Sequence, residues 1–523
     1  MQARKIAVLF ALILPLFSAA AAAQQPQHLY FRVTLGTQAK EPASGRMLIF
    51  ITAGAGAKEV DDNPFSPKPV YVAAREVTDL KPGKSIDIDT DELAYPAGFS
   101  ELKSGDYEAQ AVLDTRHTYN YSGRGPGDLV SAVISLKGWT PGRGEEPALA
   151  LTEAAPERAP RELTVEQEKA AHLEDFVSPS LSRFFGWPVH MRAWVIVPPG
   201  YDAGTKDRYL TVYWTHGFTA NLDYAKFSGA AIYKRMADGK MPPMIWVMLD
   251  ESWATGTHEF TNSLNNGPWG SALTNEFIPY LEGRYRMTGG PNGRFLQGHS
   301  SGGWATLQLQ VNYPGVFGGT WSTSPDPSDF HDFTGPNLYA PHANVYRKPD
   351  GTPWPLVRDK GKVLGTFEQF AKMERVLGPY GGQLASFDWV FSPRGKDGRP
   401  QQMFDRDTGD VDPAVVTYWR DHYDIAYRLQ NNWTALKPDL DGKIHLYVGT
   451  ADTFYLDGAA HRLKAVLDGL NAHADIRFLP DRTHFDLYTK GDDRYGLMKQ
   501  ISWDMYAVAR PDSKLKPSIN QTP

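Results

Sequence analysis

From about residue 190 onward, the chain alternates short, almost wholly apolar runs with segments that can form helices. The runs are MRAWVIVPPGY, YLTVYW and MIWVMLD, followed by RFLQ, GGTWSTS, KIHLYVG and DIRFLP. A strand that faces water on one side alternates apolar and polar residues, so near-continuous apolar runs predict strands buried on both faces. Between them, residues 271–285 carry apolar side chains at helical spacing. The pattern predicts an α/β domain with a mostly parallel, doubly wound sheet and helices on both faces.

The region before this domain has a different pattern. Short runs such as LYFRVTL, RMLIFIT and YEAQAVLD, separated by turn signals, predict a β-sandwich-like domain. Tyr119 and Tyr121 fall on a long aromatic loop, which either faces the active site of the next domain or is simply solvated; we take the solvated loop as the default. Residues 139–163 are rich in Pro, Glu, Ala and Arg, a composition typical of a linker.

The length of 523 residues exceeds what one hydrophobic core needs, so we expect at least two domains. Over a hundred residues separate the apolar runs near 321 and 446, which indicates an insertion rather than a plain connection. The predicted division is a signal peptide at 1–23, an N-terminal β-rich accessory domain at 24–138, a linker at 139–163, a catalytic domain at 164–510 with a lid-like insertion at 331–436, and a C-terminal tail at 511–523.

The first residues predict export. Arg4 and Lys5 precede a short apolar run, and three alanines follow at 21–23, as in a cleavable secretory signal. An uncleaved anchor would need a longer run. We therefore expect a secreted or periplasmic protein with no membrane span after cleavage. The chain has no cysteine, which excludes disulfides and thiol nucleophiles. Its formal charge of -6 is weak for its size and gives no reason to expect binding to nucleic acid.

The stretch FLQGHSSGGWATLQLQ carries the strongest chemical signal. Gly298-x-Ser300-x-Gly302 follows a predicted strand and precedes a predicted helix. In this context the pattern is typical of a nucleophile elbow, a strained turn that needs glycine two residues before and after the exposed serine. A glycine-rich turn without catalytic function is the alternative. We favour Ser300 as a nucleophile.

A serine nucleophile needs a base and an orienting acid. Asp452 follows the predicted strand KIHLYVG, and His484 follows the next one, so the order is serine, acid, histidine. We expect His484 to accept the serine proton and Asp452 to hold its ring. Asp457 and Asp326 compete with Asp452 for the acid role.

An oxyanion hole requires two backbone N–H donors. We expect them from Ser301 and from Phe218, which follows Gly217 in the turn after YLTVYW. The candidate substrate-binding residues are His216, Trp269, His299 and Tyr455, although Trp269 could equally pack under the following helix. The acidic run 405–412 misses the EF-hand pattern, and we expect neither a metal nor a cofactor.

These segments together resemble the putative esterase family of the α/β-hydrolases, over about 190–330 and 440–505. The matching pieces are THGF, TNSLNNGPWG, GHSSGG, NYPGVFGGTWSTS, GTADTFYL and THFDLY. The resemblance implies an α/β-hydrolase fold, the triad Ser300, Asp452 and His484, and oxyanion donors at Phe218 and Ser301. The family includes feruloyl, acetyl and siderophore esterases, S-formylglutathione hydrolases and mycolyltransferases, so the resemblance does not specify the substrate.

We therefore expect an exported serine hydrolase that cleaves carboxylic esters through an acyl-enzyme. The substrate would be a small-molecule or oligosaccharide ester, and we favour plant-derived polysaccharide or phenolic esters. A siderophore or other small polyester esterase and an acyltransferase of the same family are the alternatives. A non-catalytic carbohydrate- or surface-binding protein on a hydrolase fold is the alternative of another class. The sequence leaves the oligomeric state open.

Overall fold

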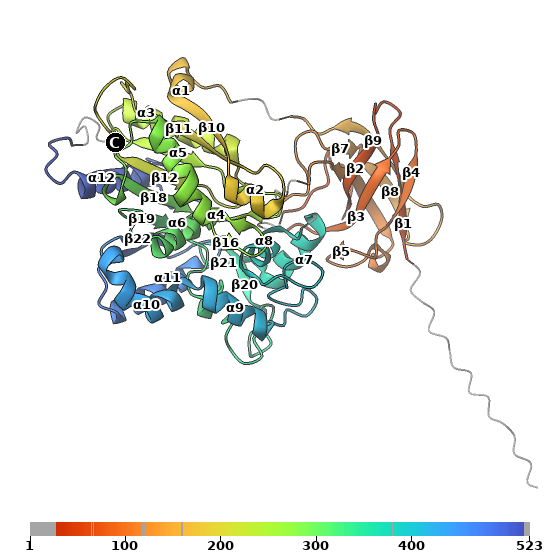
Figure 1. The fold of residues 1–523 in the computed structure, drawn as a ribbon. Coiled ribbons are helices and arrows are strands. Elements are labelled where there is room, and N and C mark those ends of the chain that lie inside the picture. Colours follow the sequence, from red (N-terminus) through yellow and green to blue (C-terminus); the bar gives the residue numbers. More distant parts are fainter. Residues whose placement is uncertain are drawn as a thin grey trace, which may run out of the picture.

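The structure is a computed structural model, which describes residues 28–63, 65, 67–117, 119, 121–157, 161–378 and 380–516. The predicted signal peptide at 1–23 and residues 517–523 of the predicted tail lie outside the described residues. The described chain forms two large sheets, one in the N-terminal region and one in the C-terminal region (Figure 1).

The C-terminal sheet has the order β10-β11-β13-β12-β18-β19-β22-β23 within the described residues. The strands from β13 to β23 in this order are parallel, whereas β10 and β11 add an antiparallel edge. Their bounds are Ala171–Val177 (β10), His190–Ile196 (β11), Thr211–Thr215 (β12), Ile245–Leu249 (β13), Arg294–His299 (β18), Thr320–Thr323 (β19), Ile444–Gly449 (β22) and Ala474–Leu479 (β23). The predicted α/β fold with a mostly parallel sheet is confirmed.

Helices cover both faces of this sheet because successive strand residues point to opposite sides. Val212 and Trp214 of β12 pack with α3 and α12, while Tyr213 packs with α4 and α5. The helices are α1 (Val165–Ala170), α2 (Pro179–Phe185), α3 (Leu222–Ala237), α4 (Trp269–Ala272), a π-helical turn at Leu273–Phe277, α5 (Ile278–Arg284), α6 (Ser301–Asn312), α11 (Leu456–Gly469) and α12 (Gly496–Ala509). Short strands β14 (Ser252–Trp253), β15 (Gly256–Thr257), β16 (Asn262–Ser263) and β17 (Gly267–Pro268) and a 3-10 turn at Pro291–Gly293 connect them.

The N-terminal sheet has the order β4-β1-β9-β7-β6-β2-β3-β5, and β8 also pairs with β6. Its strands are β1 (Tyr30–Leu35), β2 (Ala43–Ala53), β3 (Val70–Leu80), β4 (Ser85–Asp89), β5 (Ala94–Tyr95), β6 (Gly105–Asp114), β7 (Leu129–Ser131), β8 (Ile134–Trp139) and β9 (Ala148–Ala154), with a 3-10 turn at Phe99–Glu101. The sheet curls back on itself, so that Arg75 of β3 donates a hydrogen bond to the Asp87 carbonyl of β4. Residues from both ends of the sheet share one core.

The predicted linker at 139–163 is wrong in its middle. Residues 148–154 form β9, which pairs with β1 and β7. Leu149 and Leu151 are buried in the domain core. The composition of this stretch resembles a linker, but its Ala-Leu-Ala-Leu alternation places both leucines on the inner face of the sheet.

The segment predicted as a lid-like insertion, 331–436, is largely a packed part of the fold. It contains β20 (Pro355–Asp359), β21 (Lys362–Thr366), α7 (Phe367–Leu377), α8 (Gly382–Phe391), α9 (Pro413–Tyr423) and most of α10 (Ile425–Leu440), after a 3-10 turn at Phe330–Asp332. Its apolar side chains share one core with α6 and α11. A segment that buries this much apolar surface is not free to open as a separate lid.

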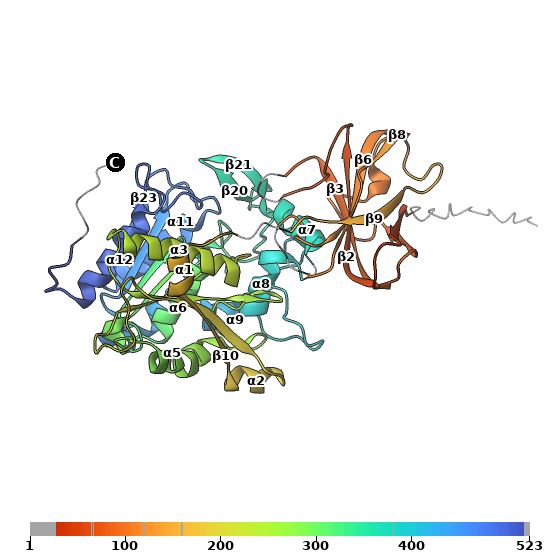
Figure 2. The same ribbon diagram turned by 90° about the horizontal axis from the view of Figure 1, so that it is seen from above.

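Helix α7 joins the two regions (Figure 2). Met373, Val376 and Leu377 on one face are buried against β2 and β3 of the N-terminal sheet. Phe367 and Phe370, in the first turn of the helix, belong to the core beside α6. Arg46 of β2 also donates hydrogen bonds to the last carbonyls of α7. The N-terminal domain is therefore fixed against the rest of the chain.

No helix among the described residues is both long enough and apolar enough to cross a bilayer.

Candidate active site

Ser300 lies in a strained turn between β18 and α6. Its backbone has φ 61° and ψ -127°, a region that residues with a side chain seldom adopt. A Cβ at Gly298 would lie 2.1 Å from the Gly302 carbonyl oxygen, and one at Gly302 would lie 2.3 Å from the His216 carbonyl oxygen. Both glycines are therefore required by backbone contacts, as expected for a nucleophile elbow.

The turn also places Ser300 at the N-terminus of α6, a helix of 12 residues. The first N–H groups of a helix lack intrahelical partners and carry a partial positive charge. Negative charge that develops on an atom bound at Ser300 would thus be stabilised.

His484 and Asp452 form a buried pair. The His484 Nδ1 atom lies 3.0 Å from Asp452 Oδ2, and the two side chains are 5% and 0% exposed. Asp452 Oδ1 accepts hydrogen bonds from the N–H groups of Phe454 and Leu456, which fix the carboxylate. Burial alone would raise the pKa of Asp452, but His484 and the hydrogen bond from the Phe454 N–H lower it below its usual value. Asp452 is thus placed to hold His484 with Nε2 free to accept a proton.

The histidine lies beside the elbow. Its ring centroid is 4.4 Å from that of His299, the residue that precedes Ser300. The structure describes both Ser300 and His484, and their side chains are not hydrogen-bonded to each other. Catalytic hydrogen bonds are often long without substrate.

The two competing carboxylates have other partners. Asp326 Oδ2 accepts a hydrogen bond from the Ser301 hydroxyl at 2.6 Å, and burial raises the pKa of Asp326 to about 6. Asp457 is paired with Arg358 at 2.7 Å. Of the three acids, Asp452 is the one bonded to His484.

The turn at Gly217 and Phe218 passes directly over Ser300. A Cβ at Gly217 would lie 3.1 Å from Ser300 Cβ, so a side chain at this position would crowd the serine. Among the described residues, neither the Phe218 nor the Ser301 N–H donates a hydrogen bond to the chain. Two free N–H groups beside Ser300 are what an oxyanion hole needs.

Two of the candidate substrate-binding residues, His216 and Trp269, are buried. The side chain of His216 is fully buried, and it contacts the Gly217 carbonyl at 2.9 Å and the Glu251 N–H at 3.1 Å. It supports the turn and does not face substrate. Trp269 is 2% exposed and stacks on His258 at 3.6 Å in the core, as in the packing alternative.

The other two candidates adjoin residues of the predicted triad. His299 contacts the Thr323 hydroxyl, and burial, followed by the neighbouring His484, lowers the pKa of His299 to about 3. It is therefore neutral near pH 7. Tyr455 follows the acid loop, and its ring is covered by Arg358 at 4.1 Å.

Arg358 on β20 is a site residue that the sequence analysis missed. Its Nε donates to the Asp452 carbonyl at 2.7 Å, and its backbone N–H donates to the Thr453 carbonyl at 2.9 Å. The inserted hairpin β20–β21 thus braces the loop that carries the acid. No local pattern marks this arginine, because its partners are about a hundred residues away in the chain.

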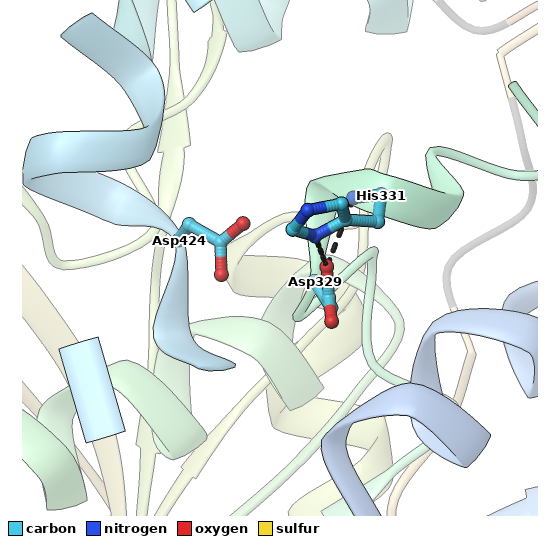
Figure 3. A group of neighbouring side chains, drawn as sticks. All are labelled: Asp329, His331 and Asp424. Carbon is cyan, nitrogen blue, oxygen red and sulfur yellow. Dashed lines mark hydrogen bonds and ion pairs between the residues drawn. The ribbon is translucent and has the colours of Figure 1, made fainter. Parts of the chain in front are cut away.

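A group of oxygen and nitrogen atoms outside the triad resembles a metal site in composition. Figure 3 shows Asp424 facing Asp329 and His331, whose ligand atoms all lie within 4.8 Å of one another. Asp329 Oδ1 already contacts His331 Nδ1 at 2.7 Å. Asp424 accepts hydrogen bonds from the Tyr339 hydroxyl and from the Tyr427 N–H. The bond to the Tyr427 N–H makes Asp424 the N-cap of α10. These bonds account for the group as a structural junction.

The acidic run 405–412 is a turn. Asp405 accepts hydrogen bonds from the N–H groups of Asp407 and Thr408, and Asp412 caps α9. These two carboxylates bind backbone N–H groups, while Asp407 pairs with Arg375 and Asp410 accepts a hydrogen bond from the Asn344 side chain.

A family model described as "Putative esterase" matches residues 186–484 of this chain. The chain therefore belongs to the putative esterase family, whose members have an α/β-hydrolase fold. No curated protein sequence matches significantly.

Several solved structures are similar at low identity. A ferulic acid esterase from Anaeromyces mucronatus, in complex with ferulic acid, is 14% identical over 64% of this chain and 89% of that chain, with a TM-score of 0.35. A fluorophosphonate-binding serine hydrolase from Staphylococcus aureus is 13% identical over 65% and 98%, with a TM-score of 0.39. An S-formylglutathione hydrolase from Agrobacterium tumefaciens is 14% identical over 65% and 94%, with a TM-score of 0.37.

Proposed function

We propose that this protein is an exported serine hydrolase that cleaves carboxylic esters through a covalent acyl-enzyme. The observation that carries the proposal is the buried contact between His484 and Asp452 beside the strained turn of Ser300. Structural turns rarely combine a serine at positive φ, a free pair of N–H groups and a histidine oriented by a carboxylate.

In the proposed reaction, Ser300 Oγ attacks the ester carbonyl while His484 Nε2 takes the hydroxyl proton. The Phe218 and Ser301 N–H groups stabilise the oxyanion. His484 then protonates the leaving alcohol. A water molecule, deprotonated by His484, releases the acid and restores Ser300. Asp452 stabilises the imidazolium in both halves.

We place the substrate among plant-derived polysaccharide or phenolic esters, and this finer proposal depends on the predicted export. A siderophore or small polyester substrate, or transfer of the acyl group to another hydroxyl, would use the same residues. Purification from a secreting host and N-terminal sequencing test export, since cleavage after residue 23 is expected.

The chemical proposal is tested by burst kinetics of the mature protein with short-chain and feruloyl chromogenic esters. We expect a burst equal to one product per protein that is lost in Ser300→Ala. Ser301→Ala is the matched control, since it removes a neighbouring hydroxyl but keeps the backbone N–H. Steady turnover that shows no burst and is retained in Ser300→Ala would refute the proposal.

A further inference from the structure

Aromatic rings from the N-terminal domain lie between the predicted oxyanion turn and the catalytic histidine. Tyr121 is 5.7 Å from Phe218, and Phe65 is 4.4 Å from Tyr121, measured between ring centroids. Phe65 is 5.5 Å from Phe454, which in turn is 4.9 Å from His484. The two middle rings of this path belong to the N-terminal domain, and the outer ones flank the site. We call these rings, together with Phe370 and Phe485, the aromatic cluster.

The N-terminal rings are held in place. The Tyr121 hydroxyl donates a hydrogen bond to Gln383 of α8 at 2.7 Å, and the Tyr121 ring lies 6.1 Å from Phe370 of α7. Helix α7 is itself buried against both domains, as described above. Tyr121 is therefore fixed beside the site and is not part of a solvated loop, so the default expectation for the aromatic loop is wrong. Phe65 packs against Tyr121 and Phe370.

Part of the aromatic cluster remains uncovered. Phe485, which adjoins His484 in sequence, is 70% exposed, and Phe65, Tyr121 and Phe454 are only partly buried. An exposed apolar ring beside a catalytic group marks a surface that a ligand covers. Phenyl faces and edges recognise planar aromatic groups by stacked or edge-on contact. A charged group placed among them would lose hydration without gaining a partner.

We propose that the N-terminal domain completes the active site, with Phe65 and Tyr121 as specificity-determining residues that bind a planar aromatic group of the ester substrate. This inference rests on the proposed function and deepens it. It gives the N-terminal domain a part in substrate selection and favours an aryl acyl or aryl alcohol group over an aliphatic one.

The test compares kcat/KM of the full mature chain for matched esters. Methyl cinnamate against methyl hexanoate probes the acyl side, and phenyl acetate against ethyl acetate probes the alcohol side. We expect Phe65→Ala to lower kcat/KM about tenfold for one of the two aryl esters, methyl cinnamate if Phe65 binds the acyl side or phenyl acetate if it binds the alcohol side. This loss is consistent with the removal of an aromatic contact and its buried area. The aliphatic partner should change less than about threefold. Phe65→Leu keeps an apolar side chain and should show the same selective loss.

Tyr30→Ala is the matched control, because Tyr30 is a 37% exposed ring on β1 of the same domain. It should leave all four rates unchanged. Phe485→Ala guards against misfolding, since removing so exposed a ring should not unfold the chain, and it should also lower the aryl rate selectively. Equal changes for aryl and aliphatic esters in both pairs would overturn the inference.

Binding separates this inference from the proposed function. Calorimetry with methyl cinnamate on Ser300→Ala measures recognition without turnover. If the parent chain hydrolyses no ester but Ser300→Ala binds methyl cinnamate and the added Phe65→Ala weakens binding about tenfold, the proposed function fails and the aromatic site stands. If esters are hydrolysed with a Ser300-dependent burst but Phe65→Ala changes neither binding nor selectivity, the inference fails alone.

Discussion

Replacing Asp452 by Asn should nearly abolish activity through the wrong histidine tautomer. Asp452 Oδ1 accepts two backbone N–H bonds, so the amide oxygen of Asn would keep that position and its NH₂ would face His484. The His484 Nδ1 atom, 3.0 Å away, would then have to accept a hydrogen bond. The ring proton would move to Nε2, which could no longer take the Ser300 proton.

We expect kcat to fall about 10⁴-fold, or about 5 kcal/mol in the barrier, because the imidazolium also loses its buried counter-charge. KM should change little, since the side chain is fully buried and does not face substrate. The assay is steady-state hydrolysis of a chromogenic ester with active-site titration.

Asp326→Asn is the matched control. Its carboxylate is also buried, but it accepts its hydrogen bond from Ser301 and not from His484. We expect kcat within about tenfold of the parent, as for a residue outside the proton transfer. A large loss in Asp326→Asn together with near-parent activity in Asp452→Asn would refute the assignment of the acid.

Three further predictions concern the elbow, the acid loop and pH. Gly298→Ala should prevent folding or lower the unfolding temperature sharply in thermal scans, because its Cβ would lie 2.1 Å from the Gly302 carbonyl oxygen; a folded, active variant would contradict this. Arg358→Met should lower kcat roughly tenfold with little change in KM, because it removes a hydrogen bond to the loop of Asp452 and does not contact substrate. An unchanged kcat would show that the contact between Arg358 and this loop is dispensable. Burial raises the pKa of Glu251 from 4.5 to about 8, so the folded state holds this proton more tightly than the unfolded state, and stability is lost as pH rises from 4.5 to 8. Glu251→Gln should therefore match the parent in urea unfolding near pH 4 and exceed it by up to about 5 kcal/mol at pH 8, and a pH-independent difference would exclude this origin.

Sequence patterns identified the elements that depend on local chemistry. Strands buried on both faces need continuous apolar runs, and five of the runs match such strands, namely β12, β13, β18, β19 and β22. The first and last runs match β11 and β23, which are less buried. The elbow could be predicted because its glycine–serine–glycine spacing is local, and Gly298 is dictated by the Gly302 carbonyl four residues on, although Gly302 is dictated by the distant His216 carbonyl. The order of acid and histidine followed from the parallel sheet, whose carboxyl edge gathers the loops after each strand.

Features set by distant contacts could not be predicted. Strand β9 was missed because the composition around it is typical of a linker. Its pairing with β1 joins residues more than a hundred positions apart. His216 and Trp269 lie next to motif residues in sequence, but the residues that pack against them, Glu251 and His258, lie outside those motifs. The positions of Phe65 and Tyr121 depend on how two domains pack, which neither domain's periodicity encodes.

The central claim is that Ser300 carries the acyl group. The most direct measurement is intact and peptide mass spectrometry of the mature protein quenched in acid during turnover of a slow ester. We expect an added mass equal to one acyl group, located on the peptide that contains Ser300 and absent in Ser300→Ala. Turnover with no acyl adduct on any peptide, or an adduct on another residue that persists in Ser300→Ala, would contradict it.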